Sequence, residues 1–231
     1  MKPDKKVCFE YEYARGTVDT SARVKIMTYE LGEDKRYAVV FEDGLTGIFS
    51  DEEFFAFGLY DTEEPLLRSY DELACEVNLK RAYLAANSFL RGSLKPEKTV
   101  EEKLSEEGFE NDVIREVMLR LREEAAVDDM KYAMRFVRKR LDAGNTSRRA
   151  LAMELREKGI SEEVAALCVE ELEVDDKALA ANIIAKKLRM GDNPEKIKRY
   201  LAGKGFSVNV IIRAFENFDL PGAASSDEEI F

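Results

Sequence analysis

The chain has 231 residues, of which 36% are charged and 45% are hydrophobic. This composition predicts a globular chain with one large or two small domains, and it excludes an intrinsically disordered or membrane-embedded one. Histidine is absent, which excludes catalytic triads that need histidine and most imidazole metal sites. The net charge of −11, averaged over the whole chain, argues against a nucleic-acid partner.

Cysteine usage and the N-terminus indicate the compartment. The three cysteines, Cys8, Cys75 and Cys168, are far apart, and there is no histidine to activate one of them, so we expect unreactive thiols in a reducing environment. The first residues lack the apolar core of a signal peptide. No apolar run approaches the roughly 20 residues that cross a bilayer. We therefore expect a cytoplasmic protein with no membrane partner.

The N-terminal part of the chain has the pattern of strands and turns. Segments rich in β-branched and aromatic residues are Val7–Tyr13, Arg23–Leu31, Arg36–Glu42 and Leu45–Ser50. The Asp43-Gly44 turn separates the last two. These segments predict a small antiparallel sheet of three to five strands. A short helix should follow, capped by Ser50 or Asp51.

The remainder of the chain has helical periodicity and repeats itself around three glycines, Gly108, Gly159 and Gly205. A leucine stands four residues before each glycine, and apolar residues stand five, nine and thirteen residues after it. This register predicts three copies of a three-helix unit. In each unit the second helix ends at the glycine, and the third helix carries the spaced apolar residues on one face.

Capping residues occur where this scheme needs helices to begin. The expected N-terminal caps are Thr146 or Ser147, Ser161, Ser207 and the Asn193-Pro194 pair. Acidic pairs, Asp128-Asp129 and Asp175-Asp176, open the first helices of the second and third units. Two adjacent carboxylates could suggest a metal site, but capping and the helix dipole account for them. We expect no metal and no cofactor.

The predicted fold class is mainly α, an elongated curved array of three tandem three-helix repeats preceded by a small antiparallel β-rich N-terminal domain. The expected segments are the β-rich domain 1–70, repeats 77–122, 127–173 and 174–218, and a flexible acidic tail 219–231. Such arrays bury apolar faces between repeats and offer long surfaces to extended partners. Because no motif of an enzyme is present, we expect a binding protein and not an enzyme.

The second repeat resembles a known family. In Val127–Val137 the residues VDDMKYAMRFV are similar to the RecX signature, in which an acidic pair precedes Tyr-Ala and Phe-Val. Lys158-Gly159-Ile160 continues the likeness, and the segment 45–50 looks like the β-rich extension of RecX proteins from Gram-positive bacteria. Two segments depart from the family pattern. Arg91–Pro96 stands where the family commonly has an Arg-x-x-Ser/Thr run that leads into the second helix of repeat 1. Glu124–Ala126 replaces the usual glycine turn before the acidic pair.

The resemblance implies a regulator of the RecA recombinase that binds RecA filaments on single-stranded DNA and inhibits or destabilises them. It thereby implies a role in recombination, DNA repair and the SOS response. The expected partner is the RecA filament, with single-stranded DNA as a further candidate, and we expect a monomer. Two alternatives stay open: a generic α-helical repeat scaffold that binds another protein, and a non-specific DNA-binding protein.

The negative charge is not spread evenly. Residues 1–76 carry nine basic and 18 acidic residues, and residues 219–231 carry four acids and no base, whereas the repeat region 77–218 carries a slight excess of bases. Residues 130–149 hold seven bases and one acid. The candidate surface for RecA or DNA is Lys131, Arg135, Arg138, Lys139, Arg148, Arg149, Lys186 and Lys187. Its first four members lie within about 100° on a helical wheel. The alternative is an ordinary solvated helix face.

The C-terminus, Pro221–Phe231, ends in an acidic run followed by Ile-Phe. It is similar to the acidic-hydrophobic tip of bacterial single-stranded DNA-binding protein. One interpretation is competition for a pocket that binds a terminal phenylalanine, and the alternative is a solubilising tail.

Overall fold

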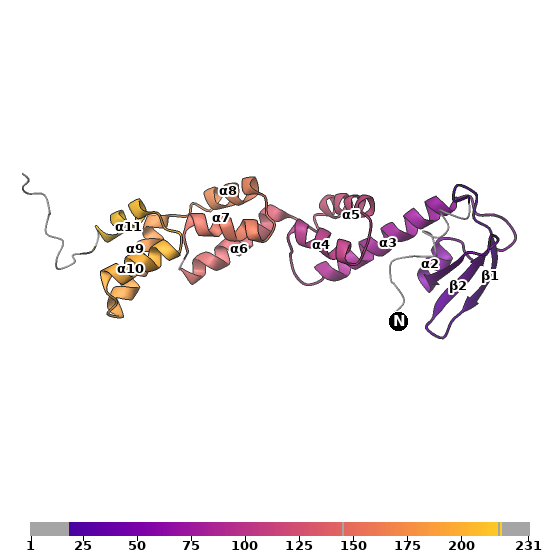
Figure 1. Ribbon diagram of the computed structural model, residues 1–231, viewed down its shortest axis with the longest axis horizontal. Coiled ribbons are helices and arrows are strands. Elements are labelled where there is room, and N and C mark those ends of the chain that lie inside the picture. Colours follow the sequence, from indigo (N-terminus) through magenta and orange to yellow (C-terminus); the bar gives the residue numbers. More distant parts are fainter. Residues whose placement is uncertain (1–18, 145, 217, 219–231) are drawn as a thin grey trace, which may run out of the picture. The chain divides into compact units, whose positions relative to one another are not determined.

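The computed structural model describes residues 19–144, 146–216 and 218. Figure 1 shows a three-stranded antiparallel sheet followed by helices, as the predicted fold class requires. The chain divides into two compact units. Among the described residues, the first unit comprises 19–94 and 99–127, and the second comprises 95–98 together with those from 128 onward. The predicted strand Val7–Tyr13 and the acidic tail lie outside the described residues.

The sheet forms one wall of an apolar core. Its strands β1 (Ile26–Leu31), β2 (Arg36–Phe41) and β3 (Thr46–Ser50) pair in the order β1-β2-β3. Phe41 and Phe49 project from the sheet into this core and are completely buried. Helix α2 (Asp51–Ala56) follows at once. Ser50, one of the two predicted caps, begins it through a capping box: the Glu53 N–H donates to Ser50 Oγ, and the Ser50 N–H donates to Glu53 Oε2.

Helix α3 (Tyr70–Leu90) belongs to two cores at once. Its first turns bury Leu73 and Val77 against the sheet. Its later turns bury Ala82 and Ala86 in the core of the first repeat. One continuous helix therefore spans the segment between the β-rich region and the repeats, and it fixes their relation within the first unit.

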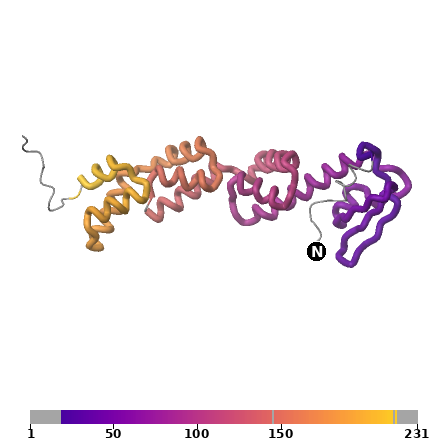
Figure 2. Tube along the Cα trace, viewed as in Figure 1, coloured from indigo at the N-terminus to yellow at the C-terminus, as the bar shows by residue number. Residues whose placement is uncertain are grey.

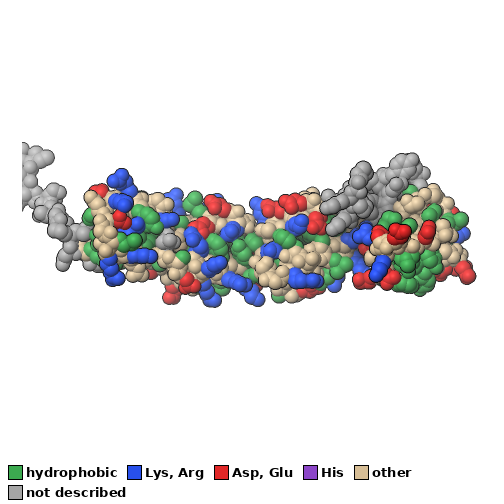
Figure 3. Space-filling model, turned by 90° about the horizontal axis from the view of Figure 1, so that it is seen from below, with side chains coloured by type: hydrophobic (Ala, Val, Ile, Leu, Met, Phe, Trp, Pro, Cys, Tyr) green, Lys and Arg blue, Asp and Glu red, His purple; other side chains and the backbone are tan. Residues whose placement is uncertain are grey.

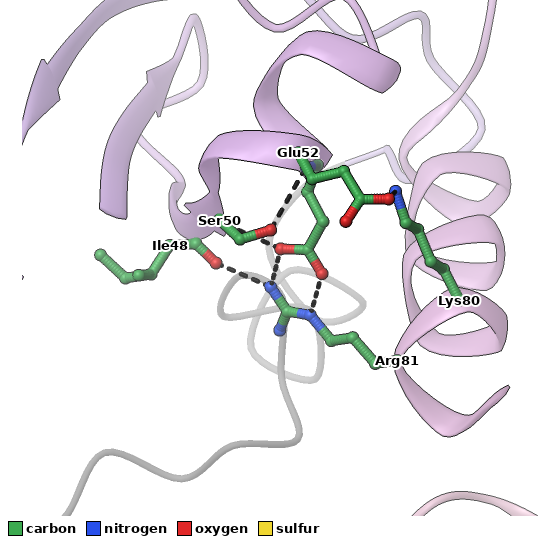
Figure 4. Close-up of polar contacts among 6 residues, drawn as sticks. Ile48, Ser50, Glu52, Lys80 and Arg81 are labelled. Carbon is green, nitrogen blue, oxygen red and sulfur yellow. Dashed lines mark hydrogen bonds and ion pairs between the residues drawn. The ribbon is translucent and has the colours of Figure 1, made fainter. Parts of the chain in front are cut away.

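A buried ion pair fastens α3 to the β-rich region (Figure 4). Arg81 Nε lies 2.7 Å from Glu53 Oε1, and Arg81 Nη2 lies 2.9 Å from Glu53 Oε2. The same Nη2 donates to the carbonyl of Ile48 at 2.8 Å. Burial of Glu53 opposes its charged form, but the Arg81 guanidinium and the Ser50 hydrogen bonds hold its pKa below the ordinary value. The neighbouring pair, Lys80 with Glu52, is more exposed.

The three-helix repeats are confirmed. Repeat 1 consists of α3, α4 (Glu97–Glu106) and α5 (Asn111–Glu123). Repeat 2 consists of α6 (Asp129–Ala143), α7 (Arg148–Glu157) and α8 (Glu162–Glu171). Repeat 3 consists of α9 (Asp176–Arg189), α10 (Pro194–Gly203) and α11 (Val208–Phe215). Figure 2 follows the chain through repeats 2 and 3 of the second unit. The curvature of the array stays a prediction.

Equivalent positions of the repeats have equivalent environments. Leu104, Leu155 and Leu201, the leucines before the three glycines, are all completely buried. The glycines themselves have φ angles of 80°, 89° and 83°, the left-handed conformation that ends a helix most easily at glycine.

The predicted helix starts are confirmed, with two refinements. Ser147, and not Thr146, caps α7 by accepting a hydrogen bond from the Ala150 N–H. At the start of α4, the residue before the helix is Pro96, which has no side-chain acceptor, and the Glu97 N–H donates to Asp129 Oδ1 at 2.9 Å.

Candidate binding surface

Helix α6 separates its apolar and basic residues onto opposite faces. Ala133 and Val137 are completely buried in the core of repeat 2, as expected from the 3.6-residue period. The basic residues on the other side, Lys131, Arg135, Arg138 and Lys139, are all exposed. Figure 3, seen from the side on which α6 lies, shows Lys and Arg side chains gathered over repeat 2. The structure thus brings these four predicted residues together on one helix face.

The exposed bases of this face carry their charge without compensation. Within the described part of the chain, no carboxylate forms an ion pair with Lys131, Arg135, Arg138 or Lys139. Arg140, one residue further along, is different: its Nε and Nη2 lie 2.8 and 2.6 Å from the Glu154 carboxylate. That bidentate pair raises the pKa of Arg140. Arg140 therefore joins α6 to α7, while its neighbours are free to meet a partner.

The start of α7 adds two more cations. Arg148 and Arg149 are exposed in its first turn, which contains no acidic residue. Neither side chain forms an ion pair with another described residue. The Arg148 backbone N–H donates to the Asp176 carboxylate at 2.6 Å, so the two exposed side chains, and not the helix dipole, supply the positive charge at this end of the helix. This end of repeat 2 is therefore suited to an anionic partner.

The two predicted residues of repeat 3 differ from each other. Lys186 is exposed and forms no ion pair with a described residue. Lys187 is partly buried, lies 3.2 Å from Asp192 and sits 4.1 Å from the centre of the Tyr200 ring. Hydrogen bonds from Lys196 and Lys187 hold the pKa of Asp192 below its ordinary value. Lys187 thus has partners within repeat 3, where it holds the end of α9 near α10.

Sequence reasoning did not include Lys158, which lies against α6, among the candidate binding residues. This residue is exposed, and its Nζ lies 5.4 Å from the centre of the Phe136 ring on α6. It was assigned only to the Lys-Gly ending of the second helix. The signal that could have identified it is its place in a repeat already rich in unpaired bases.

The described residues were also compared with the requirements of a metal site and of a reactive thiol. They contain no group of three or more Cys, Asp or Glu side chains that could hold a metal ion. Cys168 is completely buried, and burial raises the pKa of its thiol, so it is a poor nucleophile. Burial also raises the pKa of Cys75, which is exposed as a residue; Cys8 lies outside the described residues. No described helix is both long enough and apolar enough to span a bilayer.

The fold and this surface define a class of protein: a tandem array of three-helix domains with an N-terminal sheet. Residues 128–167 match the family model for the second three-helix domain of RecX. This segment is the one in which the sequence resembles RecX proteins, so the match agrees with the resemblance drawn from the sequence.

Two solved structures share the fold. The crystal structure of RecX from Lactobacillus salivarius is 24% identical with a TM-score of 0.57, and the match covers 62% of this chain and 98% of that one. A crystal structure of regulatory protein RecX is 20% identical with a TM-score of 0.60, and the match covers 84% of this chain and 98% of that one. No curated protein matches the chain.

Proposed function

We propose that this protein regulates RecA by binding RecA filaments on single-stranded DNA and inhibiting or destabilising them. The match of residues 128–167 to the family model for the second three-helix domain of RecX supports the partner. The single structural observation that carries the proposal is the basic face of α6, whose four exposed bases form no ion pair with a described residue. A nucleoprotein filament exposes phosphates and carboxylates, and an exposed surface without internal ion pairs can meet them without first breaking contacts of its own.

The distribution of charge supports an oriented encounter. The N-terminal 76 residues carry twice as many acids as bases, whereas residues 130–149 carry seven bases and one acid. A polyanionic partner repels the first segment and attracts the second, so long-range electrostatics would favour approach through repeat 2. The whole-chain charge of −11 therefore does not exclude a nucleoprotein partner.

The proposal is tested by the DNA-dependent ATPase of RecA. The triple variant Arg135→Glu, Arg138→Glu, Lys139→Glu reverses the unpaired face of α6 and leaves its buried face unchanged. If each charge contributes about 0.5 kcal/mol, the concentration for half-inhibition should rise roughly tenfold or more. Circular dichroism verifies that the variant is folded.

A matched control reverses three other exposed bases. Arg36, Arg91 and Arg115 lie in the first unit, and none of them forms an ion pair with a described residue. Their reversal to Glu changes the net charge by the same amount and should leave the half-inhibitory concentration nearly unchanged. Equal losses in both variants would show that only net charge matters, and full inhibition by the α6 variant would contradict the assigned surface.

The two alternatives are tested by two different assays. A generic scaffold would leave the RecA ATPase unaffected at every concentration. A non-specific DNA-binding protein would bind single-stranded DNA in the absence of RecA, with an affinity that falls steeply as salt is raised.

A further inference from the structure

The two carboxylates of the acidic pair that opens repeat 3 have different hydrogen-bond partners. Asp175 caps its own helix, because its Oδ1 accepts from the N–H groups of Lys177 and Ala178 at 2.8 and 3.2 Å. Asp176 Oδ1 instead accepts from the Arg148 N–H at 2.6 Å. Arg148 is the first residue of α7 in the preceding repeat. Asp176 therefore supplies a cap to a helix of another repeat.

The same turn of α7 also meets the glycine loop of repeat 3. Ser147 Oγ is buried and donates to the carbonyl of Lys204 at 2.9 Å. A Cβ atom on Gly205 would lie 2.7 Å from Ser147 Oγ and 3.2 Å from the Ala150 Cβ. The start of α7 is thus held between the beginning of α9 and the loop after α10.

This contact recurs one repeat earlier, inside the second unit. The Glu97 N–H at the start of α4 donates to Asp129 Oδ1 at 2.9 Å, while Asp128 caps its own helix through the Lys131 N–H. A Cβ atom on Gly159 would lie 2.8 Å from the Lys98 Cβ. The second carboxylate thus makes the equivalent contact at both positions, and each glycine lies close to the start of the second helix of the preceding repeat.

The two ends of the array break the pattern in complementary ways. In repeat 3 the position equivalent to Glu97 and Arg148 is Pro194, which has no N–H to donate. In repeat 1 the position equivalent to Asp129 is Asn78, and its buried Oδ1 accepts no hydrogen bond from a described residue. An amide at an unpaired buried position avoids the larger cost of an unpaired buried carboxylate.

We infer that Asp176 is a positioning residue: it fixes repeat 3 to repeat 2 through the Arg148 N–H, and Pro194 and Asn78 mark the ends of a series of such contacts. A single cap between rigid helices restricts rotation of one repeat against the next, and so aligns the surfaces that successive repeats present. This inference concerns the chain alone and does not depend on RecA binding.

The first test measures amide hydrogen exchange of the full-length protein by NMR. In Asp176→Ala the Arg148 N–H loses its acceptor, and its exchange should become about tenfold faster, as expected for a hydrogen bond to a charged group. Asp175→Ala is the matched control, because it removes the neighbouring carboxylate. It should speed the exchange of the Lys177 and Ala178 N–H groups and leave the Arg148 N–H unchanged. Unchanged exchange at Arg148 in Asp176→Ala would overturn the inference.

The second test measures the geometry of the junction. Spin labels at Leu167→Cys on α8 and Val208→Cys on α11 occupy exposed positions, in a chain with Cys8→Ser and Cys75→Ser and with Cys168 left in the core. The distance distribution should broaden in Asp176→Ala and stay narrow in Asp175→Ala and in Asp176→Asn, which keeps an acceptor oxygen. Equal widths in all variants would contradict a positioning role.

A third variant removes the donor instead of the acceptor. Arg148→Pro copies the residue found at Pro194, and the first position of a helix tolerates proline; Arg148→Ala controls for loss of the side chain. Arg148→Pro should broaden the distribution as Asp176→Ala does, and the double variant should broaden it no further. Additive effects of the two changes would overturn the single-contact account. This variant also decides the matter if Asp176→Ala does not fold.

Discussion

The two units hold their parts together by different means. In the first unit, a continuous helix runs from the β-rich core into repeat 1, and the ion pair between Arg81 and the buried Glu53 carboxylate holds it there. In the second unit, the repeats are fastened by a backbone N–H that reaches a carboxylate of the next repeat. The ion pair between Arg81 and Glu53 depends on two particular side chains, so it does not repeat along the chain. A backbone contact needs only a carboxylate and a glycine in register, so it can recur along an array.

The largest expected effect tests the ion pair of the first unit. Arg81→Ala leaves the Glu53 carboxylate, whose side chain is 7% exposed, without its partner. The free energy of unfolding should fall by about 3–5 kcal/mol. Lys80→Ala is the matched control because Lys80 pairs with Glu52, which is 74% exposed, and it should cost at most about 1 kcal/mol. Urea unfolding measures both, and similar losses would show that burial does not distinguish the pairs.

The next effect tests the glycine contact of the second unit. Gly205 and Gly191 have nearly equal φ angles of +83° and +82°, so substitution by alanine should cost about 1–2 kcal/mol of backbone strain at each. Only at Gly205 would the new Cβ atom meet neighbours, Ser147 and Ala150. Gly205→Ala should therefore cost a further 1–3 kcal/mol or so. Thermal unfolding of the two variants measures the difference, and equal losses would refute close packing at this loop.

A smaller effect separates two caps. Ser147 caps α7 and also donates to Lys204, whereas Ser161 only caps α8. Ser161→Ala should lower the free energy of unfolding by about 1 kcal/mol. Ser147→Ala should lower it by about 2 kcal/mol, because it also leaves the Lys204 carbonyl without its partner. Chemical denaturation of both variants measures the two losses. A larger loss in Ser161→Ala than in Ser147→Ala would contradict the second role of Ser147.

The smallest expected effect is a difference between Glu53 and Asp176 in how their contributions to stability depend on pH. The pKa of Glu53 lies below its ordinary value of 4.5 in the folded protein, so its stabilisation is present above pH 4.5 and is lost as pH falls through the folded pKa. Burial raises the pKa of Asp176 above its ordinary value of 3.8. The folded state therefore binds the Asp176 proton more tightly than the unfolded state does. The stabilisation from this proton is present below pH 3.8 and declines as pH rises through the raised pKa of the folded state.

Glu53→Gln and Asp176→Asn remove these titrations separately. As pH is lowered through about 4, the stability of the wild type should fall relative to Glu53→Gln and rise relative to Asp176→Asn. Denaturation at a series of pH values measures both differences. Changes of the same sign would mean that the two carboxylates do not differ in environment as the structure indicates.

The sequence could predict the repeats because their determinants are local and occur three times. Leucine, glycine and the helix caps define each unit within about 50 residues, and Ser161 and Ser207 begin helices where expected. The basic face of α6 was predictable for the same reason, since helical spacing alone places Lys131 and Arg135 together.

Contacts between distant segments could not be predicted in this way. Glu53 and Arg81 are 28 residues apart in the chain, and neither local sequence indicates that the two side chains will pair. Asp176 was recognised as a residue at a helix start, but a single sequence does not show that its carboxylate serves another helix. Lys187 belongs to the same basic run as Lys186, and only the positions of Asp192 and Tyr200 separate their environments.

Direct binding to RecA filaments tests the central claim, that repeat 2 carries the contact. Fluorescence anisotropy of the labelled full-length chain would be measured against filaments of RecA on single-stranded DNA with a slowly hydrolysed nucleotide. We predict that the wild type and the Arg36→Glu, Arg91→Glu, Arg115→Glu control bind with similar affinity, and that Arg135→Glu, Arg138→Glu, Lys139→Glu binds roughly tenfold more weakly. Wild-type affinity in the α6 variant would contradict the account.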